Sequence, residues 1–510
     1  MSPTGTATQA TTVADLLSPL AGVDDRGVYF EDDFVPWSRH LADAAVRATV
    51  LGSWFSAELP PHVGVLLTNT TEFSALFAAA ARHGFVLVGL NTTRRGAALA
   101  ADIERAECQI VLCGNDTRHL LDGLELSGVR IVDVDSPAWH DAISRATPAP
   151  VVDAAADDLL MLIFTSGTTG DPKAVRCTHR TFAVSGPMLA ERFDIGPRDV
   201  VYLSMPMFHS NAMIAGWSVA VSGGASIVLR RSFSARGFVA DLHRYGVTYA
   251  NYVGKPLHYV LATDPDPRDA TSSLRIMYGN EASARDRQRF AERFGCRVVD
   301  GFGSTEGGVA ITRTPDTPHD ALGPLRAPTA VVDVETGEPV PAGVVGEIVN
   351  SSGPGLFSGY HNDPESTAER MRGGIYHTGD LAWVDDEGYL HFAGRLGDWL
   401  RVDGENIGTG PIERILLRHP DIRQVAVHGI PVEIGDEIEA VLVVDSLNPD
   451  DFAAFLATQD DLGPKQWPHR IRIVDALPET ATFKTVKRLL AADATPPTWR
   501  REGRDYRPAT

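Results

Sequence analysis

The sequence predicts an α/β protein: a large N-terminal domain of parallel-type sheets with helices and a small β-barrel, followed by a small, mobile α+β C-terminal domain. Three observations support this. The 510 residues exceed what one hydrophobic core usually serves. Short apolar runs alternate with helix-like stretches in the first 300 residues or so. The pattern of apolar runs and turn residues then changes twice along the chain, near residues 321 and 395.

The first part of the chain carries the alternation. Apolar runs at 63–67, 109–112 and 160–164 are separated by longer stretches such as 71–82, whose pattern is helical. Continuous apolar runs of this length are typical of strands buried on both faces, as in parallel sheets. We therefore expect helices on the faces of a mainly parallel sheet.

The sequence pattern after residue 321 predicts a subdomain of short strands and a separate C-terminal domain. Residues 321–392 contain short strands punctuated by ETGEPVPAG, SSGPG and DDEGY, which favours hairpins or a small barrel. Beyond Arg395 comes a compact α+β segment of about 100 residues, a typical size for a small domain. We place the domains at 1–396 and 397–510, with the boundary at Gly397.

Composition excludes several classes of protein. The chain is 44% apolar with a net charge of -20, so it has ample core material and repels phosphate backbones; we expect no nucleic-acid partner. Its four cysteines form no CxxC pair and the N-terminus lacks a secretory pattern, which predicts a reducing, cytoplasmic location. The longest uncharged stretch, 210–229, is interrupted by polar residues and a Gly-Gly turn. We expect no membrane span, and leave peripheral membrane contact and oligomeric state open.

The most informative segment is TSGTTGDPK at 165–173, directly after an apolar run. Glycines let the backbone approach an anion, hydroxyls add donors and a lysine adds positive charge, so the loop is suited to cradle phosphates. It is not a Walker A loop, because Pro172 precedes the lysine and Ala174 follows it. The predicted phosphate-binding residues are Thr165, Ser166, Gly167, Thr168, Thr169, Gly170 and Lys173.

This loop resembles the signature of the adenylate-forming superfamily, which includes acyl-CoA synthetases, the adenylation domains of peptide synthetases and beetle luciferases. Four more blocks follow in that family's order: YGNEAS at 278–283, DGFGSTEGG at 300–308, YHTGDLAWVDDEGYLHFAGR at 376–395 and LPETATFKTVKR at 477–488. The resemblance spans residues from about 30 to 490.

The second block departs from a dinucleotide motif. Glu306 occupies the place of the third glycine in GxGxxG, and a carboxylate there repels pyrophosphate unless a divalent cation lies between them. The resemblance implies that Glu306 holds Mg²⁺, Thr305 donates to the α-phosphate, and Phe302, beside Gly303, stacks on adenine. The family more often has Tyr at the position of Phe302, so stacking is kept and a phenol hydrogen bond is lost.

Two other blocks supply nucleotide ligands by resemblance. Asp380 follows His-Thr-Gly at the end of an expected strand, where a carboxylate can accept both ribose hydroxyls. The resemblance makes Asp380 the ribose ligand and Arg395 a second ribose contact that anchors the hinge. Gly279 and Asn280 match the loop that lies against the adenine face.

The segment GRLGDWLRVDGENI resembles the branch of fatty-acid-transport proteins and very-long-chain acyl-CoA synthetases, which also contains enzymes for bile acids and steroid side-chain acids. ATFK around the expected catalytic lysine and GNEAS point to the same branch. The family's hinge residue is usually Asp or Lys, whereas this chain has Gly397 followed by Asp398. Glycine suits a pivot with two backbone states.

Lys484 is the expected catalytic residue of adenylation. A mobile ammonium can stabilise two anions brought together as a carboxylate attacks the α-phosphate, although sequence alone does not separate Lys484 from Lys487. The resemblance also places His209 near the substrate carboxylate, in a gating or orienting role. The apolar residues around it fit either the acyl pocket or plain core: Met207, Phe208, Met213, Ile214 and Trp217.

The resemblance thus implies an acid–thiol ligase that uses ATP and Mg²⁺ to convert a fatty, long-chain or steroid-derived acid to its acyl-adenylate and then transfers the acyl group to coenzyme A. Three alternatives remain: delivery of the acyl group to a carrier protein, a membrane-associated fatty-acid uptake protein without catalysis, and a phosphotransferase. We expect neither an appended carrier domain nor a spanning helix, and the residues around Lys173 are not those of a Walker A phosphotransferase.

Overall fold

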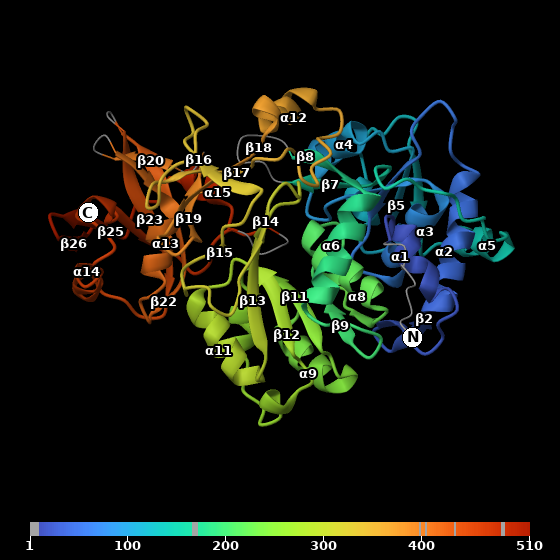
Figure 1. The fold of residues 1–510 in the computed structure, drawn as a ribbon, viewed down its shortest axis with the longest axis horizontal. Helices are drawn as coiled ribbons and strands as arrows, with labels where there is room; N and C mark the ends of the chain where they lie inside the picture. The colour runs from blue at the N-terminus through green and yellow to red at the C-terminus, as the bar shows by residue number, and fades with distance from the viewer. Residues whose placement is uncertain are drawn as a thin grey trace, which may run out of the picture.

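The computed structural model describes residues 10–165, 172–396, 399–402, 405–432, 435–480 and 485–509. In Figure 1 the N-terminal part lies on the right, residues from about 200 to 300 form the lower centre, and the C-terminal part lies on the left. The two ends of the chain therefore lie far apart along the longest axis.

The first sheet has six strands in the order β6-β5-β3-β4-β7-β8, parallel except for the last pair. The strands are β3 (His62–Leu66), β4 (Val86–Gly89), β5 (Ile110–Cys113), β6 (Arg130–Asp133), β7 (Leu159–Thr165) and β8 (Lys173–Thr178). Three of them, β3, β5 and β7, fall within a residue or so of the expected apolar runs, and β3, β4 and β5 are buried along their whole length, as a sheet covered on both faces requires.

Helix α3 (Thr71–His83) confirms the helical pattern predicted at 71–82. The Thr70 side chain accepts from the Phe73 amide and caps its first turn. Gly84 ends it with φ 80°, and its N–H donates to the Ala80 carbonyl. The other helices before residue 200 are α1 (Val13–Leu17), α2 (Trp37–Gly52), α4 (Gly96–Arg105), α5 (Pro137–Arg145) and α6 (His179–Arg192), with short 3₁₀ turns at Ser18–Leu20 and Arg118–Leu121.

The second sheet has eight strands in the order β14-β13-β12-β11-β9-β10-β1-β2, with antiparallel strands at both edges. Its strands are β1 (Gly27–Phe30), β2 (Asp33–Pro36), β9 (Val200–Leu203), β10 (Ser226–Leu229), β11 (Tyr249–Val253), β12 (Ile276–Asn280), β13 (Arg297–Gly303) and β14 (Ala310–Thr312). Helices α9 (Ala235–Tyr245), α10 (Pro256–Leu261) and α11 (Ala284–Phe294), with a 3₁₀ turn at Asp269–Thr271, connect its parallel strands.

One continuous core joins the two sheets. It includes Val63 of β3 and Val201 of β9 together with buried side chains of α3 and α6. At its centre Phe77 and Trp217 meet edge to face, with ring centroids 4.9 Å apart, and the Trp217 indole donates to Ser74 Oγ. The two sheets therefore belong to one packed body rather than to two independent domains.

The uncharged stretch at 210–229 folds as a buried helix, turn and strand. It comprises α7 (Ser210–Ala212), a π-helical turn (Met213–Trp217), α8 (Ser218–Gly223) and β10. Gly224, with φ 65°, turns the chain between α8 and β10. Within the described ranges, no helix is long and apolar enough to cross a membrane.

Residues after β14 form a five-stranded antiparallel sheet in the order β15-β19-β18-β17-β16. The strands are β15 (Gly323–Pro324), β16 (Thr329–Val332), β17 (Gly346–Asn350), β18 (Tyr376–Val384) and β19 (Tyr389–Arg395), with α12 (Pro364–Arg370) and a 3₁₀ turn (Arg372–Gly374) inserted before β18. This is the region in which the sequence predicts hairpins. Among the described residues, β15 and β16 end the sheet without pairing to each other.

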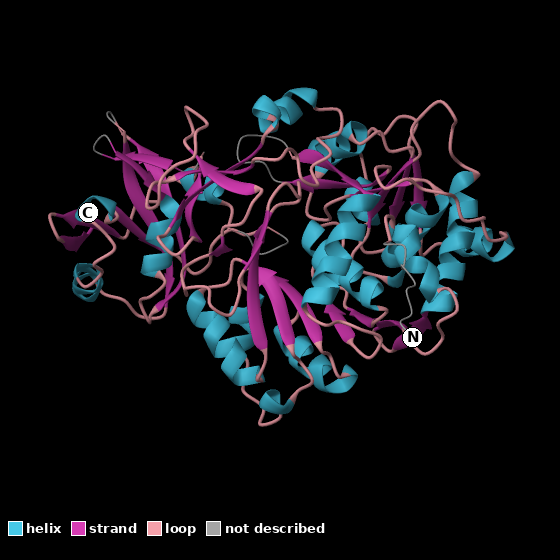
Figure 2. Cartoon of the chain, in the orientation of Figure 1, coloured by secondary structure: helices cyan, strands magenta, loops and turns pink. Residues whose placement is uncertain are grey.

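The C-terminal part has a core of its own, formed by buried side chains between Leu400 and Tyr506. A hairpin, β20 (Trp399–Val402) and β21 (Glu405–Gly408), precedes a sheet in the order β22-β23-β24-β25-β26. The elements are α13 (Thr409–Leu416), β22 (Ile422–Pro431), β23 (Asp436–Val444), α14 (Pro449–Ala457), a 3₁₀ turn (Pro464–Gln466), β24 (Arg470–Ile473), α15 (Lys487–Ala491), β25 (Trp499–Glu502) and β26 (Asp505–Pro508). Figure 2 shows this mixture of strands and helices.

Candidate active site

The predicted phosphate loop connects two paired strands. Thr165 ends β7 and Lys173 begins β8, the two residues face each other across the antiparallel pair, and the Thr165 hydroxyl donates to the Lys173 carbonyl at 3.4 Å. A Walker A loop leads into a helix, so the strand after Lys173 agrees with the interpretation that this loop is of another kind. The predicted phosphate-binding residues between them lie outside the described ones: Ser166, Gly167, Thr168, Thr169 and Gly170.

Glu306 and Thr305 follow the end of β13 and face different partners. The Tyr360 hydroxyl donates to Glu306 Oε1 at 2.9 Å, and the hydroxyls of Thr305 and Ser210 lie 2.8 Å apart. Lys173 Nζ lies 5.3 Å from the centre of the Tyr360 ring, within the range of a cation–π contact. Tyr360 therefore links the end of the phosphate loop to the predicted metal ligand.

Sequence reasoning missed Tyr360 and Arg370. Burial and the Glu306 charge raise the pKa of Tyr360, while Arg370 opposes the shift, so the phenol keeps its proton and can donate to Glu306. Arg370 ends α12, whose start is marked by the capping side chain of Asp363 and by Pro364. That capping pattern was visible in the sequence, and it fixes the helix that presents Arg370.

Asp380 and Arg395 pair across β18 and β19. Arg395 Nε donates to Asp380 Oδ1 at 2.9 Å, and Asp380 is only 5% exposed. Burial raises the pKa of Asp380, the positive charges of Arg395 and Arg370 oppose this, and the Glu306 charge adds to it. The charge of Glu306, the predicted metal ligand, thus acts on Asp380, the predicted ribose ligand. The positive charge of Arg370 offsets part of this repulsion.

Gly379 has a steric requirement beside this pair. Its φ is 72°, and a Cβ there would lie 2.6 Å from Arg370 Nη1. A side chain would both strain the backbone and displace the guanidinium. Glycine at this position therefore lets Arg370 approach the strand that carries Asp380.

Gly279 and Asn280 end β12, next to β11. A Cβ at Gly279 would lie 2.2 Å from the Tyr252 carbonyl oxygen, so only glycine allows this approach. Asn280 Oδ1 is buried and has no hydrogen-bond partner within the described part of the chain. A buried acceptor is costly when unpaired, and the exocyclic amine of adenine is a donor of the type that would satisfy it.

Phe302 lies on β13, half-buried, with its ring centre 6.0 Å from that of Phe392. The two rings are tilted at 45° to each other, and Phe302 also packs against the core that joins the two sheets. Gly303 follows on the same strand, opposite Ala310, and is exposed.

His209 precedes α7, and the next residue, Ser210, contacts Thr305. This places the predicted orienting residue one position from the described site. Its apolar neighbours belong mainly to the core: Met207, Phe208, Met213 and Trp217 are buried, and Ile214 is partly buried. The part of the segment nearest His209 also contains the π-helical turn, a feature often found at functional sites.

Lys484 and the predicted pivot residues Gly397 and Asp398 lie outside the described residues. The competing lysine is described. Lys487 Nζ lies 2.8 Å from Thr409 Oγ1 and 2.8 Å from Glu413 Oε1, both within the C-terminal part. Its ammonium is therefore engaged in holding α15 against α13.

The segment before Lys484 contacts the large N-terminal body. Glu479 forms a close ion pair with Lys255, which caps α10, and lies 3.4 Å from the Tyr259 hydroxyl. Lys255 Nζ also donates to Gln424 Oε1 of β22 at 3.1 Å. Glu479 and Thr485 form a bridge on either side of the segment that contains Lys484. This cluster, the Lys255–Glu479 contact, joins the C-terminal part to the second sheet.

Comparison with known proteins decides the family. The profile of the AMP-binding enzyme family matches residues 43–361, and that of the AMP-binding enzyme C-terminal domain matches residues 411–484. The chain belongs to the AMP-binding enzyme family. The resemblance drawn from the sequence motifs is confirmed.

Curated relatives of this AMP-binding enzyme are CoA ligases. The medium/long-chain-fatty-acid–CoA ligase FadD17 of Mycobacterium marinum is 55% identical over 488 residues, 94% of this chain and 96% of that protein. The steroid-22-oyl-CoA synthetase of Rhodococcus jostii is 39% identical over 505 residues, 94% of this chain and 91% of that protein. The enzyme is accordingly an AMP-forming acid–CoA ligase, with ATP, Mg²⁺, CoA and a small-molecule acid as its reactants and cofactor.

A solved structure shares the whole architecture. ATP-bound MatB from Rhodopseudomonas palustris is 26% identical, with a TM-score of 0.84 over 94% of this chain and 98% of that one. The apo form of MatB gives 0.75 over the same shares. This AMP-binding enzyme thus superposes more closely on the ATP-bound form of MatB than on its apo form.

Proposed function

We propose that the enzyme activates a medium- or long-chain fatty acid and transfers it to coenzyme A. The observation that carries the proposal is the convergence of Glu306, Tyr360, Arg370, Asp380 and Arg395 from three separate segments into one polar site. Two carboxylates and two guanidinium groups in one site suit a nucleotide with its metal ion, because carboxylates can accept from ribose hydroxyls and hold Mg²⁺ while guanidinium groups offset phosphate charge. The 55% identity to a fatty-acid ligase supports a fatty acid over a steroid side-chain acid.

In the first half-reaction the acid carboxylate attacks the α-phosphate of ATP, and pyrophosphate leaves. Bound Mg²⁺ would neutralise phosphate charge, and a carboxylate oxygen of Glu306 fits as its ligand because Mg²⁺ prefers oxygen donors. Tyr360 keeps Glu306 oriented through its hydroxyl. Thr305 donates to the α-phosphate, while Lys484 stabilises the charge that develops between the two anions.

The nucleoside is held by separate groups. The Asp380 oxygen that Arg395 Nε does not use can accept from ribose hydroxyls. Asn280 Oδ1 accepts from the adenine amine, and Phe302 stacks on the ring. His209 orients the substrate carboxylate beside Thr305. These contacts bind ATP so that the α-phosphate faces the acid. Holding the two reactants in this orientation accelerates the reaction between them.

In the second half-reaction the C-terminal domain, residues 397–510, reorients about Gly397 and the CoA thiol attacks the acyl carbonyl. AMP leaves and the thioester remains, so the proton of the thiol is released and charge is balanced. The independent core of residues 400–506 supports movement as a unit. The Lys255–Glu479 contact would have to break in this movement.

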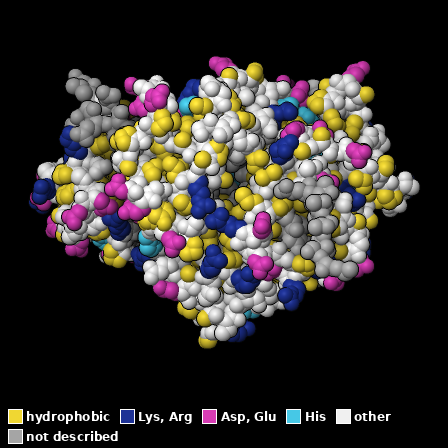
Figure 3. Space-filling view, in the orientation of Figure 1, with side chains coloured by type: hydrophobic (Ala, Val, Ile, Leu, Met, Phe, Trp, Pro, Cys, Tyr) yellow, Lys and Arg dark blue, Asp and Glu magenta, His cyan; other side chains and the backbone are white. Residues whose placement is uncertain are grey.

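We propose that this chemistry takes place in the cytoplasm. The four cysteines, Cys108, Cys113, Cys177 and Cys296, are free and buried, as suits a reducing compartment. On the face drawn in Figure 3, acidic side chains lie among the Lys and Arg side chains, so this face offers no uniformly basic surface to a nucleic acid.

A panel of acids tests the substrate and the acceptor together. AMP release is measured with saturated fatty acids of increasing chain length and with a steroid side-chain acid, with and without CoA. We expect CoA-dependent turnover with medium- or long-chain acids. Turnover confined to the steroid acid would overturn the fatty-acid assignment. If acyl-AMP accumulates in the presence of CoA and the acyl group is transferred only to a carrier protein, the assignment of CoA as the acceptor is wrong.

A further inference from the structure

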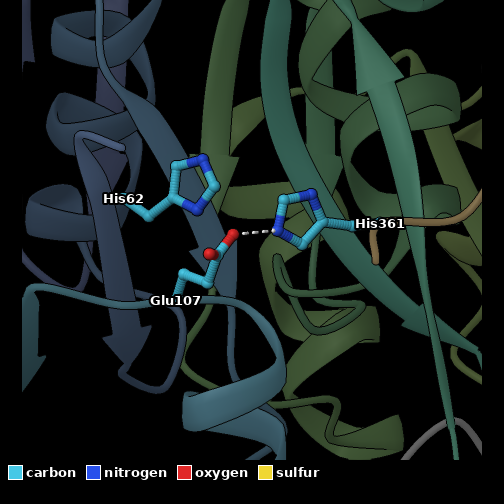
Figure 4. A group of neighbouring side chains, drawn as sticks. All are labelled: His62, Glu107 and His361. Atoms are coloured by element: carbon cyan, nitrogen blue, oxygen red, sulfur yellow. Dashed lines mark hydrogen bonds and ion pairs between the residues drawn. The ribbon is translucent and has the colours of Figure 1, made fainter. Parts of the chain in front are cut away.

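A second cluster of chemically competent side chains lies beside the nucleotide site. His62 begins β3, Glu107 lies between α4 and β5, and His361 follows Tyr360 in the loop before α12. One ligand-type atom from each lies within 4.8 Å of the other two. Figure 4 shows the three side chains facing one another from separate segments. None of them has a part in the reaction proposed above.

The backbone holds these residues rigidly. The His361 N–H donates to the Ala174 carbonyl at 2.8 Å, and the Arg176 N–H donates to the Gly359 carbonyl at 3.0 Å, so the loop pairs with β8 on both sides of Tyr360. Glu107 adopts a left-handed backbone conformation, with φ 51°. A non-glycine residue in that region costs free energy and is often found at functional sites.

The Glu107 carboxylate is directed by its own partners. Its Oε2 lies 3.0 Å from His361 Nε2 and accepts from Asn362 Nδ2 at 3.0 Å. Asn362 is also left-handed, with φ 53°. His62 and His361 are 3% and 7% exposed, whereas Glu107 is exposed. The cluster therefore has two buried imidazoles behind a carboxylate that solvent ions can reach.

We propose that His62, Glu107 and His361 bind one divalent transition-metal ion, with Zn²⁺ as the ion that fits the ligands best. Two imidazoles and one carboxylate are a recurrent ligand set for zinc, and three protein ligands leave a position for water. Magnesium and calcium prefer all-oxygen sites, so this cluster differs in chemistry from the Glu306 site.

The protonation states agree with this proposal. Burial lowers the pKa of His62, and the neighbouring His361 and Arg176 contribute in the same direction, so the imidazole is neutral as a metal ligand must be. The hydrogen bond from Asn362 lowers the pKa of Glu107, which keeps it anionic. His62 Nδ1 lies 2.7 Å from the Ala106 carbonyl. Coordination through Nδ1 exchanges that contact for the metal and leaves the ring proton on Nε2.

Metal binding would fasten two parts of the molecule. His62 lies on β3 of the first sheet, Glu107 lies in the connection that leads into β5, and His361 belongs to the loop whose Tyr360 donates to Glu306. The positive charge of Arg176 near His62 works against a cation, so we expect weaker binding than at a structural zinc site with four ligands. The proposal does not depend on the identity of the acid substrate.

The test is a titration of the full-length enzyme with Co²⁺, without nucleotide and with excess Mg²⁺ present. We expect visible absorption bands that saturate at about one equivalent of Co²⁺ and are displaced by Zn²⁺, because Co²⁺ and Zn²⁺ share this ligand chemistry. Glu107→Gln and His361→Gln should each weaken Zn²⁺ binding, measured by calorimetry, at least about tenfold.

Glu104→Gln is the matched control, because Glu104 is exposed, lies three residues from Glu107 and undergoes the same charge change. It should bind Zn²⁺ as the parent does, as should Glu306→Gln, which alters the nucleotide site. Glu107 is exposed, so we expect Glu107→Gln to fold normally, and a parental Tm without metal will show this. Absence of a stoichiometric Co²⁺ spectrum, or unchanged Zn²⁺ affinity in Glu107→Gln and His361→Gln, would overturn the proposed metal site. The three side chains would then serve only as a structural hydrogen-bonded cluster.

Discussion

The groups that we propose to bind the nucleotide and the segment that precedes Lys484 are held in different ways. Asp380, Arg395 and Asn280 lie on strands, and their backbone positions are fixed by ladders inside sheets. Among the described residues, those on either side of Lys484 are joined by a bridge between Glu479 and Thr485 and by a hydrogen bond from Val486 N–H to the Pro478 carbonyl, and Glu479 reaches the large body through the Lys255–Glu479 contact. A site for binding ATP gains from rigidity, whereas a group that serves only one of two half-reactions must be able to leave.

The largest effect expected from this difference is at Lys484. Lys484→Ala should abolish adenylate formation, because no other charge replaces the ammonium between the two anions, yet leave thioester formation from supplied acyl-AMP nearly intact. Acid-dependent ATP/pyrophosphate exchange measures the first step, and thioester yield from synthetic acyl-AMP measures the second.

Lys487→Ala is the matched control, because Lys487 is bonded to Thr409 and Glu413 instead. Lys487→Ala should lower Tm and leave the rate of adenylate formation nearly unchanged. The assignment of Lys484 fails if Lys484→Ala forms acyl-AMP at the parental rate, or if Lys487→Ala has the phenotype predicted for Lys484→Ala.

The next effect concerns the rigid site. Glu306→Gln removes the carboxylate that we propose as a Mg²⁺ ligand while keeping the oxygen that Tyr360 bonds, so turnover should fall about a hundredfold or more and the Mg²⁺ requirement should rise. Tyr360→Phe keeps the carboxylate and loses only the hydrogen bond, so it should cost about tenfold or less. Both follow from initial rates at graded Mg²⁺ concentrations. An unchanged Mg²⁺ titration in Glu306→Gln would remove Glu306 from the metal site.

The pivot between the two regions gives a smaller effect that separates the half-reactions. Gly397→Pro fixes φ near about -65° and removes an N–H, so the two domains should be restricted to one arrangement. ATP/pyrophosphate exchange should persist while thioester formation falls at least about tenfold, or about 1.4 kcal/mol in barrier. Equal loss of both steps would indicate misfolding, and equal retention would move the pivot to Asp398.

Much of this could be predicted from the sequence because local signals were strong. The apolar runs marked β3, β5 and β7, and the loop predicted to bind phosphates at 165–173 connects β7 and β8. Tyr360 and Arg370 could not be found, because their roles depend on a loop that packs on β8 and on a helix that ends near β18. Neither contact leaves a periodic pattern in the sequence.

The cluster of His62, Glu107 and His361 was invisible for the same reason. His62 and Glu107 are 45 positions apart, Glu107 and His361 are 254 apart, and His361 reaches the other two through the pairing of the 359–361 loop with β8. Metal-ligand spacing rules detect sites built on one hairpin or one helix. They do not detect sites that join distant segments of a fold.

The smallest expected effect is at the Lys255–Glu479 contact, and it bears most directly on how the segment that precedes Lys484 is held. Both side chains are 18% exposed, so the pair is partly screened and should contribute about 1 kcal/mol to the arrangement that adenylates, or about fivefold in rate. Lys255→Met and Glu479→Gln should each slow ATP/pyrophosphate exchange by about this factor. Thioester formation from acyl-AMP should be unchanged or faster, because the adenylating arrangement competes with the second step.

A double-mutant cycle distinguishes this contact from two unrelated losses. If the ion pair itself is responsible, the double variant should be no slower than either single variant, since the interaction is already gone. Exchanging the charges, Lys255→Glu with Glu479→Lys, should restore part of the lost rate. Additive effects, or equal slowing of both half-reactions, would show that these residues support the fold rather than the placement of Lys484, and the contrast between a rigid site and a releasable segment would then need another basis.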